Sequence, residues 1–220
     1  MTFTATDNRT PPLSGEMTVH ITVINVENAI VLSVTPMLLK ADGISTAEVI
    51  ATLISNGQPT PNAQVELTVT EGMGSLAQTS GTTDENGRFS TLYTAGTTSG
   101  DVRITAAAPE YNVSDAVTLR LDGDGPAIVQ VTGDAQGTTG EVVEIALTAQ
   151  DPTEPISADI YLDGAAQTMG KVGPDEFRYQ IQIPLTCVDP ISSYIIASDG
   201  LGNTTRTPEA GSYTITVVDN

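Results

Sequence analysis

Apolar and polar residues alternate along most of this chain, with the period of two residues that is typical of β-strands. Alternating segments fall at residues 47–53, 65–69, 89–93, 102–106 and 117–121. The turn-forming pairs near these segments are Asn56-Gly57, Glu71-Gly72, Asn86-Gly87 and Ser99-Gly100. Short strands separated by such turns predict an antiparallel β-sandwich over about residues 29–121.

The sequence DGDGP at residues 122–126 marks the strongest boundary in the chain, because acidic residues, glycine and proline favour a linker. The strand-like segments beyond it read IVQVT, EVVEIALTAQ, ISADIYLDG, FRYQIQI, SYIIASD and SYTITVV. They predict a second sandwich over residues 127–220. The expected fold class is therefore all-β, with two tandem antiparallel sandwiches. We expect antiparallel ladders between the first and last strands of each sandwich, which would resist pulling.

Composition restricts the partners of this chain. Its 220 residues include 27 acidic side chains but only 8 lysines and arginines, which gives a net charge of −19. Nucleic acids and anionic membranes bind clusters of basic residues, so neither is an expected partner. The acidity fits either a solvated surface or attraction of divalent cations and basic partners. Met1 is not followed by the basic and apolar regions of a signal peptide, so we expect an internal piece of a longer exported protein.

Catalytic signals are weak. The chain has one histidine, His20, and one cysteine, Cys187, which cannot supply the three or four ligands of a zinc site. No nucleophile elbow accompanies His20, and no phosphate-binding or dinucleotide-binding glycine motif occurs. Paired-carboxylate hydrolysis stays open, although it needs a cleft that small sandwiches seldom provide. We therefore expect no enzyme activity.

Residues 41–108 carry a specific resemblance. The opening ADG-STA, the segments NGQP and PNAQVELTV, the turn TTDENG and the closing TSGDVRITA resemble the bacterial Ig-like repeats of invasin and intimin type. The resemblance implies an Ig-like sandwich at residues 29–121. It also implies a non-catalytic structural or adhesive stalk module of a large prokaryotic cell-surface or secreted protein, which spaces a binding head from the cell. The alternatives are a direct binding module for a protein or carbohydrate, and accessory domains of a secreted multidomain enzyme.

The segment YIIASDGLGN at residues 194–203 resembles, more loosely, a corner found in many extracellular Ig-like modules. It supports a second Ig-like domain at residues 127–220. Together these resemblances imply an extracellular or cell-surface location and a monomer. The implied partners are neighbouring Ig-like or cadherin-like domains, with a surface protein or glycan as a further candidate.

Residues 1–28 resemble the last two strands of a cadherin-like repeat, through ATD at residues 5–7 and PPLS at residues 11–14. The resemblance implies a C-terminal hairpin remnant. It also implies calcium ligands where this remnant meets the next domain, namely Asp7, Asn25, Glu27 and Asn28.

A second candidate calcium place follows from the residues of the linker. Calcium takes six to eight oxygen ligands, many of them carboxylates. Asp122 and Asp124 supply two carboxylates within the DGDG sequence, although the spacing of a calcium-binding loop is absent. The alternative to a calcium site is a solvated acidic turn without a bound metal.

Overall fold

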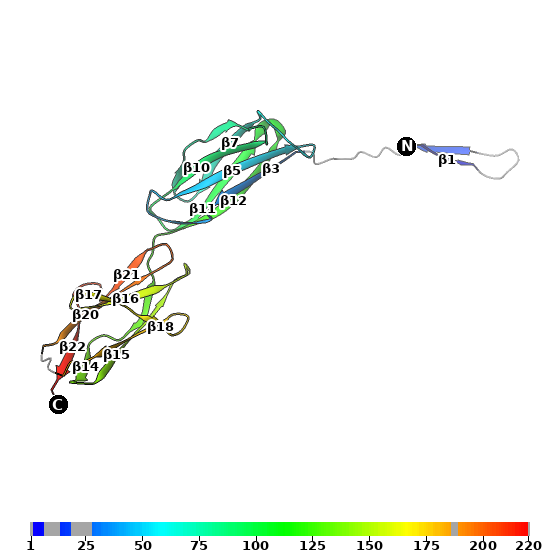
Figure 1. Cartoon of the computed structure of the whole chain (residues 1–220). Coiled ribbons are helices and arrows are strands. Elements are labelled where there is room, and N and C mark those ends of the chain that lie inside the picture. Colours follow the sequence, from blue (N-terminus) through cyan, green and yellow to red (C-terminus); the bar gives the residue numbers. More distant parts are fainter. Residues whose placement is uncertain (1, 7–13, 19–27, 186–188, 220) are drawn as a thin grey trace.

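The computed structural model describes residues 2–6, 14–18, 28–185 and 189–219 (Figure 1). At the N-terminus, β1 (Thr2–Thr6) pairs antiparallel with β2 (Ser14–Thr18) as a two-stranded sheet. The assignment of this hairpin to a cadherin-like repeat stays a prediction. His20 and Cys187 lie outside the described residues.

The first sandwich contains two sheets that face each other across one core. One sheet has the order β3-β5-β10-β8, with β6 beside β5, and the other has the order β4-β12-β11-β7-β9. A short 3-10 turn, η1 (Pro109–Tyr111), connects β11 to β12. The strand bounds are β3 (Asn28–Thr35), β4 (Leu38–Lys40), β5 (Thr46–Ser55), β6 (Gln58–Pro59), β7 (Gln64–Glu71), β8 (Gly74–Leu76), β9 (Ser80–Thr82), β10 (Arg88–Ala95), β11 (Gly100–Ala108) and β12 (Val113–Asp122).

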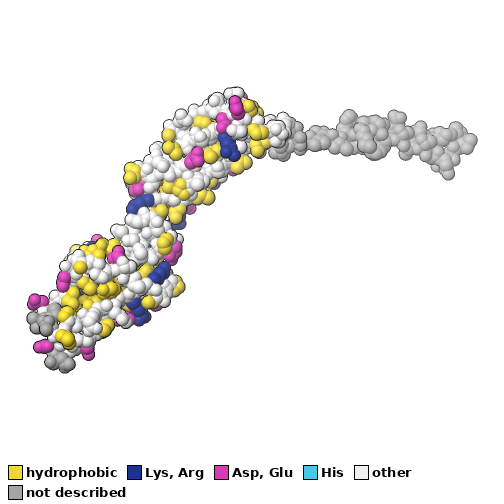
Figure 2. Space-filling model, in the orientation of Figure 1, with side chains coloured by type: hydrophobic (Ala, Val, Ile, Leu, Met, Phe, Trp, Pro, Cys, Tyr) yellow, Lys and Arg dark blue, Asp and Glu magenta, His cyan; other side chains and the backbone are white. Residues whose placement is uncertain are grey.

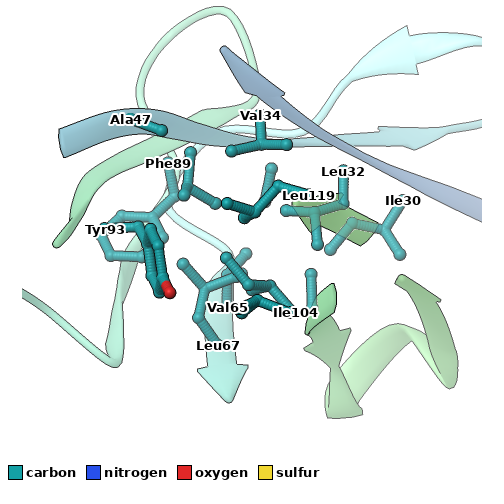
Figure 3. Packing of buried hydrophobic residues seen from close by; sticks show 14 of the residues in the cluster. Ile30, Leu32, Val34, Ala47, Val65, Leu67, Phe89, Tyr93, Ile104 and Leu119 are labelled. Carbon is teal, nitrogen blue, oxygen red and sulfur yellow. The ribbon is translucent and has the colours of Figure 1, made fainter. Parts of the chain in front are cut away.

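Alternation along these strands builds the first core, as predicted, because every second side chain of a strand points to the same face. Figure 3 shows apolar side chains of both sheets meeting between the layers. Tyr93 is fully buried, and its hydroxyl donates a hydrogen bond to the carbonyl oxygen of Met73 at 2.6 Å. Burial raises the pKa of the Tyr93 hydroxyl above its ordinary value. Gly74 makes this packing possible, since a Cβ there would lie 2.2 Å from the Tyr93 hydroxyl oxygen.

The second sandwich has its own core. One sheet has the order β13-β15-β19-β18, and the other has the order β14-β22-β20-β16-β17, with β21 beside β20. The strand bounds are β13 (Ala127–Val131), β14 (Ala135–Thr138), β15 (Val142–Gln150), β16 (Ser157–Leu162), β17 (Ala165–Thr168), β18 (Gly170–Lys171), β19 (Glu176–Gln182), β20 (Ile191–Ser198), β21 (Thr204–Thr207) and β22 (Tyr213–Val218). Its largest fully buried side chains are Phe177, Ile145, Leu147, Ile160, Ile183 and Ile195. The predicted fold class, tandem Ig-like antiparallel sandwiches, is confirmed.

The pairing of early and late strands differs from the expectation. In the first sandwich β4 pairs with β12 in parallel, with Leu39 opposite Leu121. In the second, β14 pairs with β22 in parallel, with Gln136 opposite Thr216. The expected antiparallel ladder is wrong here because the early part of each sandwich is split. β3 and β13 join one sheet antiparallel, whereas β4 and β14 cross to the other sheet and run beside the last strand.

Among the described residues, no helix has the length and apolar character that a membrane crossing needs.

Candidate functional site

Three carboxylates from separate parts of the chain meet where the two sandwiches join. Asp122 ends β12 of the first sandwich, whereas Asp151 and Asp199 directly follow β15 and β20 of the second. One carboxylate oxygen from each lies within 4.8 Å of the other two. Asp122 and Asp199 are each only 6% exposed, and Asp151 is half-buried. The group therefore belongs to neither sandwich alone.

The corner after β20 fixes Asp199. Its Oδ1 accepts hydrogen bonds from the backbone N–H groups of Leu201 at 2.9 Å and Asn203 at 2.8 Å. Its Oδ2 accepts from the Asn203 side-chain amide at 2.8 Å. This is the ordinary way in which an aspartate stabilises a turn that follows it. The same amide nitrogen of Asn203 also donates to the carbonyl oxygen of Asp122 at 3.2 Å, which links the corner to the first sandwich.

The loop after β15 fixes the other two carboxylates. The backbone N–H of Thr153 donates to Asp151 Oδ1 at 2.7 Å. The buried Thr153 hydroxyl donates to Asp122 Oδ2, which is a second hydrogen bond between the sandwiches. Gly200 N–H donates to the Thr153 carbonyl oxygen at 3.2 Å, so the loop and the corner also hold each other.

The linker at residues 123–126 is attached to both sandwiches. The Gly123 N–H donates to the Ser99 hydroxyl oxygen at 2.9 Å, on the first sandwich. Gly125 packs against the second, where an added Cβ would lie 2.4 Å from the Thr204 carbonyl carbon. Lys40 Nζ donates to the Gly202 carbonyl oxygen at 2.9 Å and so bridges the two sandwiches directly.

The electrostatics of this site favour a cation. Within the described residues, the ion pairs engage other acids, Glu154 and Glu144, and none reaches Asp122, Asp151 or Asp199. Three carboxylates at this separation repel one another in their charged form, and burial weakens the screening of that repulsion. Carboxylate oxygens are the ligands that calcium prefers, and main-chain carbonyls and water commonly complete its shell. The residues present therefore fit a hard divalent cation.

The structure places only some of the predicted calcium ligands at the junction. Asp122 lies in the cluster, but the exposed Asp124 contributes its backbone N–H, which donates to Asp122 Oδ1 at 3.1 Å. Asp7, Asn25 and Glu27 lie outside the described residues.

Asn28 lies where β3 begins, in contact with the last residues of β5 and η1. Its Oδ1 accepts from the Ser55 hydroxyl at 2.7 Å, and its Nδ2 donates to the Tyr111 carbonyl oxygen at 3.3 Å. The calcium assignment of the N-terminal junction stays a prediction.

Sequence reasoning missed Asp151 and Asp199 as partners of Asp122. Asp199 stands in the corner segment that carried the second Ig-like resemblance, which gave a reason to place it after a strand but none to aim it at Asp122. Asp151 precedes a proline and a threonine, a common turn sequence. The usable signal is positional, because Asp151 and Asp199 directly follow β15 and β20, one strand from each of the two facing sheets, where the second sandwich meets the linker.

Two depressions in the described residues are candidate sites for an organic ligand, and both are small. A depression of about 160 Å³ lies over β13, β15 and β19, and another of about 290 Å³ lies beside η1. Sites for small molecules usually measure roughly 300–1,000 Å³. Neither depression therefore identifies a substrate site.

The two sandwiches and their hydrogen-bonded junction place this chain in the class of tandem Ig-like β-sandwich proteins. Residues 29–122 match the family model described as bacterial Ig-like domain (group 1). The predicted relationship to bacterial Ig-like domains is confirmed.

Comparison with solved structures gives the same fold. FdeC, an adhesin of Escherichia coli, is 13% identical over 94% of this chain and 68% of that chain, with a TM-score of 0.50. The D0-D1 domain of intimin is 15% identical over 84% of this chain and 94% of that one, with a TM-score of 0.43. A C-terminal 282-residue intimin fragment, solved in complex with the intimin-binding domain of the translocated intimin receptor, is 16% identical over 84% and 62%, with a TM-score of 0.45. The comparison with curated proteins gave no match.

Proposed function

We propose that this chain is a stalk segment of a large prokaryotic surface or secreted protein, which holds a binding head away from the cell. The observation that carries the proposal is the junction, where Thr153 and Asn203 of the second sandwich hydrogen-bond Asp122 of the first. A spacer needs joints that limit bending, and side-chain bonds between buried groups do so. The bacterial Ig-like family and the adhesin relatives support this role. The proposed role is non-catalytic and extracellular.

The strand pairing also suits a spacer under load. Force along the chain pulls the early strand and the last strand of each sandwich in opposite directions. Because β4 and β12 run in parallel, as do β14 and β22, that force shears their hydrogen bonds together instead of opening them one at a time. Each sandwich thus presents a mechanical clamp between its two ends.

The proposed joint includes calcium at Asp122, with Asp151 and Asp199 as its further carboxylate ligands. The support is the spacing of the three oxygens and the lack of an ion-paired lysine or arginine beside them in the described residues. A bound cation would remove the repulsion between the carboxylates and tie both sandwiches to one centre. Asp124 is outside this ligand set, and the four N-terminal candidates form a separate proposed place.

The test of the spacer is the spread of orientations between the two sandwiches. If the junction is a stiff joint, residual dipolar couplings or small-angle X-ray scattering of the chain would report a narrow range of angles between the two sandwiches. The double variant Thr153→Val with Asn203→Ala should broaden that distribution while each sandwich keeps its amide spectrum. An unmodified chain whose sandwiches already tumble independently would overturn the proposed joint.

In this proposal the binding head, which contacts the partner, belongs to another part of the parent protein. The intimin fragment is solved with a receptor domain, so a surface protein is the partner class that the relatives suggest for the parent protein.

A further inference from the structure

The outer face of the second sandwich carries a stack of planar side chains. Tyr161 on β16 and Tyr194 on β20 lie directly opposite each other, with ring centroids 4.5 Å apart and ring planes 7° from parallel. On the other edge of β20, the Arg206 guanidinium carbon lies 4.2 Å from the Tyr194 ring centroid. The Arg206 cation thus caps one end of the stack. Figure 2 shows hydrophobic side chains gathered over this sandwich, in the area of β16, β17 and β20 in Figure 1.

The other end of the stack is open. The next residue in the row is Ala166 on β17, which pairs with Tyr161 and is exposed. Neighbouring strands lie about 4.8 Å apart, so a planar group placed over the Ala166 methyl would continue the spacing of the two tyrosine rings. Alanine leaves this place empty, and the outer face of the Tyr161 ring borders it.

An acidic group faces the same place. Asp159 lies two residues before Tyr161 on the same face of β16, opposite Thr168 of β17. Among the described residues, no hydrogen bond or ion pair engages its carboxylate. A ring face attracts cations through its quadrupole, and Arg206 already uses the Tyr194 ring in this way. The open place therefore combines an aromatic face with a free negative charge.

The backbone of β17 is also available. β17 is the last strand of its sheet. The Met169 N–H donates to the Ala158 carbonyl oxygen, and hydrogen bonds of an antiparallel pair alternate along the strand. Gln167 and Ala165 therefore face β16 with their backbone groups, whereas those of Ala166 and Thr168 point away from the sheet. β17 has no charge and no proline, the usual protections of an edge strand.

We propose that this face docks an extended segment of a partner protein, which adds to β17 and places an arginine over Ala166. Backbone groups of Ala166 and Thr168 bond the added strand. The residue opposite Ala166 points to the outer face, and its guanidinium reaches back over the alanine to the Tyr161 ring and the Asp159 carboxylate. Arginine fits better than lysine because its planar group both stacks and pairs with a carboxylate. The chain's net charge of −19 favours a basic partner.

The experiment uses the whole chain with ¹³C-labelled tyrosine rings and ¹⁵N-labelled amides. The chain has six tyrosines, so the Tyr161 ring signals are assigned by their loss in Tyr161→Phe and Tyr161→Leu. The probe is the acetylated and amidated heptapeptide TVTRTVT, with matched peptides that carry lysine, glutamate or tyrosine at the centre. We expect saturable shifts of the Tyr161 ring and of the Ala166 and Thr168 amides with the arginine peptide, at least fivefold weaker binding of lysine, and none of glutamate.

Variants separate the parts of the proposal. Tyr161→Phe keeps the ring and should bind as the parent does, whereas Tyr161→Leu should lose most of the arginine preference. Asp159→Asn should weaken the arginine peptide several-fold, while the control Glu110→Gln in the first sandwich should change nothing. Ala166→Glu occupies the place and should abolish binding without disturbing other amides.

The proposal is overturned by no binding at millimolar peptide, by equal binding of the arginine and glutamate peptides, or by shifts that spare Tyr161. Tighter binding of the tyrosine peptide, or Tyr161 shifts caused by methyl glycosides with no arginine preference, would assign the face to another ligand and also overturn it.

Discussion

The Thr153 hydroxyl of the second sandwich donates a hydrogen bond to the Asp122 carboxylate of the first. Both side chains are buried, and they come from the end of β12 in the first sandwich and from the loop after β15 in the second. A buried carboxylate that loses a partner is costly, since water cannot replace the lost bond. This single contact therefore makes the stability of one sandwich depend on the presence of the other.

Thr153→Val should weaken that dependence. Valine has nearly the shape of threonine but cannot donate, so Asp122 would keep its burial and lose one hydrogen bond. We expect a loss of about 1–3 kcal/mol in the free energy of unfolding. Denaturant unfolding, followed by amide signals from each sandwich, measures it. Thr168→Val on the exposed edge strand β17 is the matched control and should cost little. Equal losses in both variants would mean that the junction bond contributes nothing.

Calcium should stabilise the chain through the Asp122 cluster. A ligand that binds only the folded state at a hundred times its Kd adds about 2.7 kcal/mol. For domains of about 60–100 residues, 1 kcal/mol raises the Tm by roughly 4–8 °C, so this change should raise it by about 10 °C or more. Thermal unfolding in EDTA and in millimolar calcium checks it.

Two substitutions decide where the calcium binds. Asp151→Asn should remove the Tm shift if the metal lies at the domain junction, and Glu27→Gln should remove it if the metal lies at the N-terminal place. Asp124→Asn should leave the shift intact, because this exposed residue adds no oxygen to the cluster. If neither of the first two variants changes the response, both proposed places are wrong.

Acid should destabilise the first sandwich partly through the turn at Asp84. The backbone N–H of Arg88 and that of Asn86 donate to Asp84 Oδ1, and they hold the pKa of that carboxyl below its ordinary value. The pKa of Asp84 is lower in the folded state than in the unfolded state, where it is near 3.8. The charged carboxylate therefore stabilises the fold at pH values above the unfolded-state pKa, and this stabilisation is lost as the pH falls through the folded-state pKa. Stability measured from pH 6 to pH 2 should therefore fall less steeply in Asp84→Asn. Glu85→Gln is the neighbouring control, and an identical acid limb in the parent and Asp84→Asn would contradict the assignment.

The sequence predicted the strands well because a period of two needs only local information. It predicted neither the parallel β4–β12 pairing nor the junction cluster, and both misses have the same origin. Pairing direction depends on where the chain crosses between sheets, here the short stretch between β3 and β4, which carries no pattern of its own. Asp122, Asp151 and Asp199 meet only after two sandwiches are folded and joined. Asp124 looked equivalent to Asp122 in the linker, yet Asp122 ends β12 and is buried against Thr153 and Asn203 of the second sandwich, whereas Asp124 lies beyond the strand and is exposed.

The parallel clamp of the second sandwich should determine its resistance to force. The Thr139 N–H donates to the Val218 carbonyl oxygen at 3.0 Å, just beyond the last β14–β22 pair. Thr139→Pro removes this donor, so fewer bonds share the shear load and the peak unfolding force of the second sandwich should fall. Single-molecule pulling through the two termini measures it, with the first sandwich as an internal reference. Ala166→Pro is the matched proline control, because its N–H points away from the sheet and bonds nothing within it. A force lowered equally by both prolines would show that general destabilisation, and not the clamp, determines the mechanical strength.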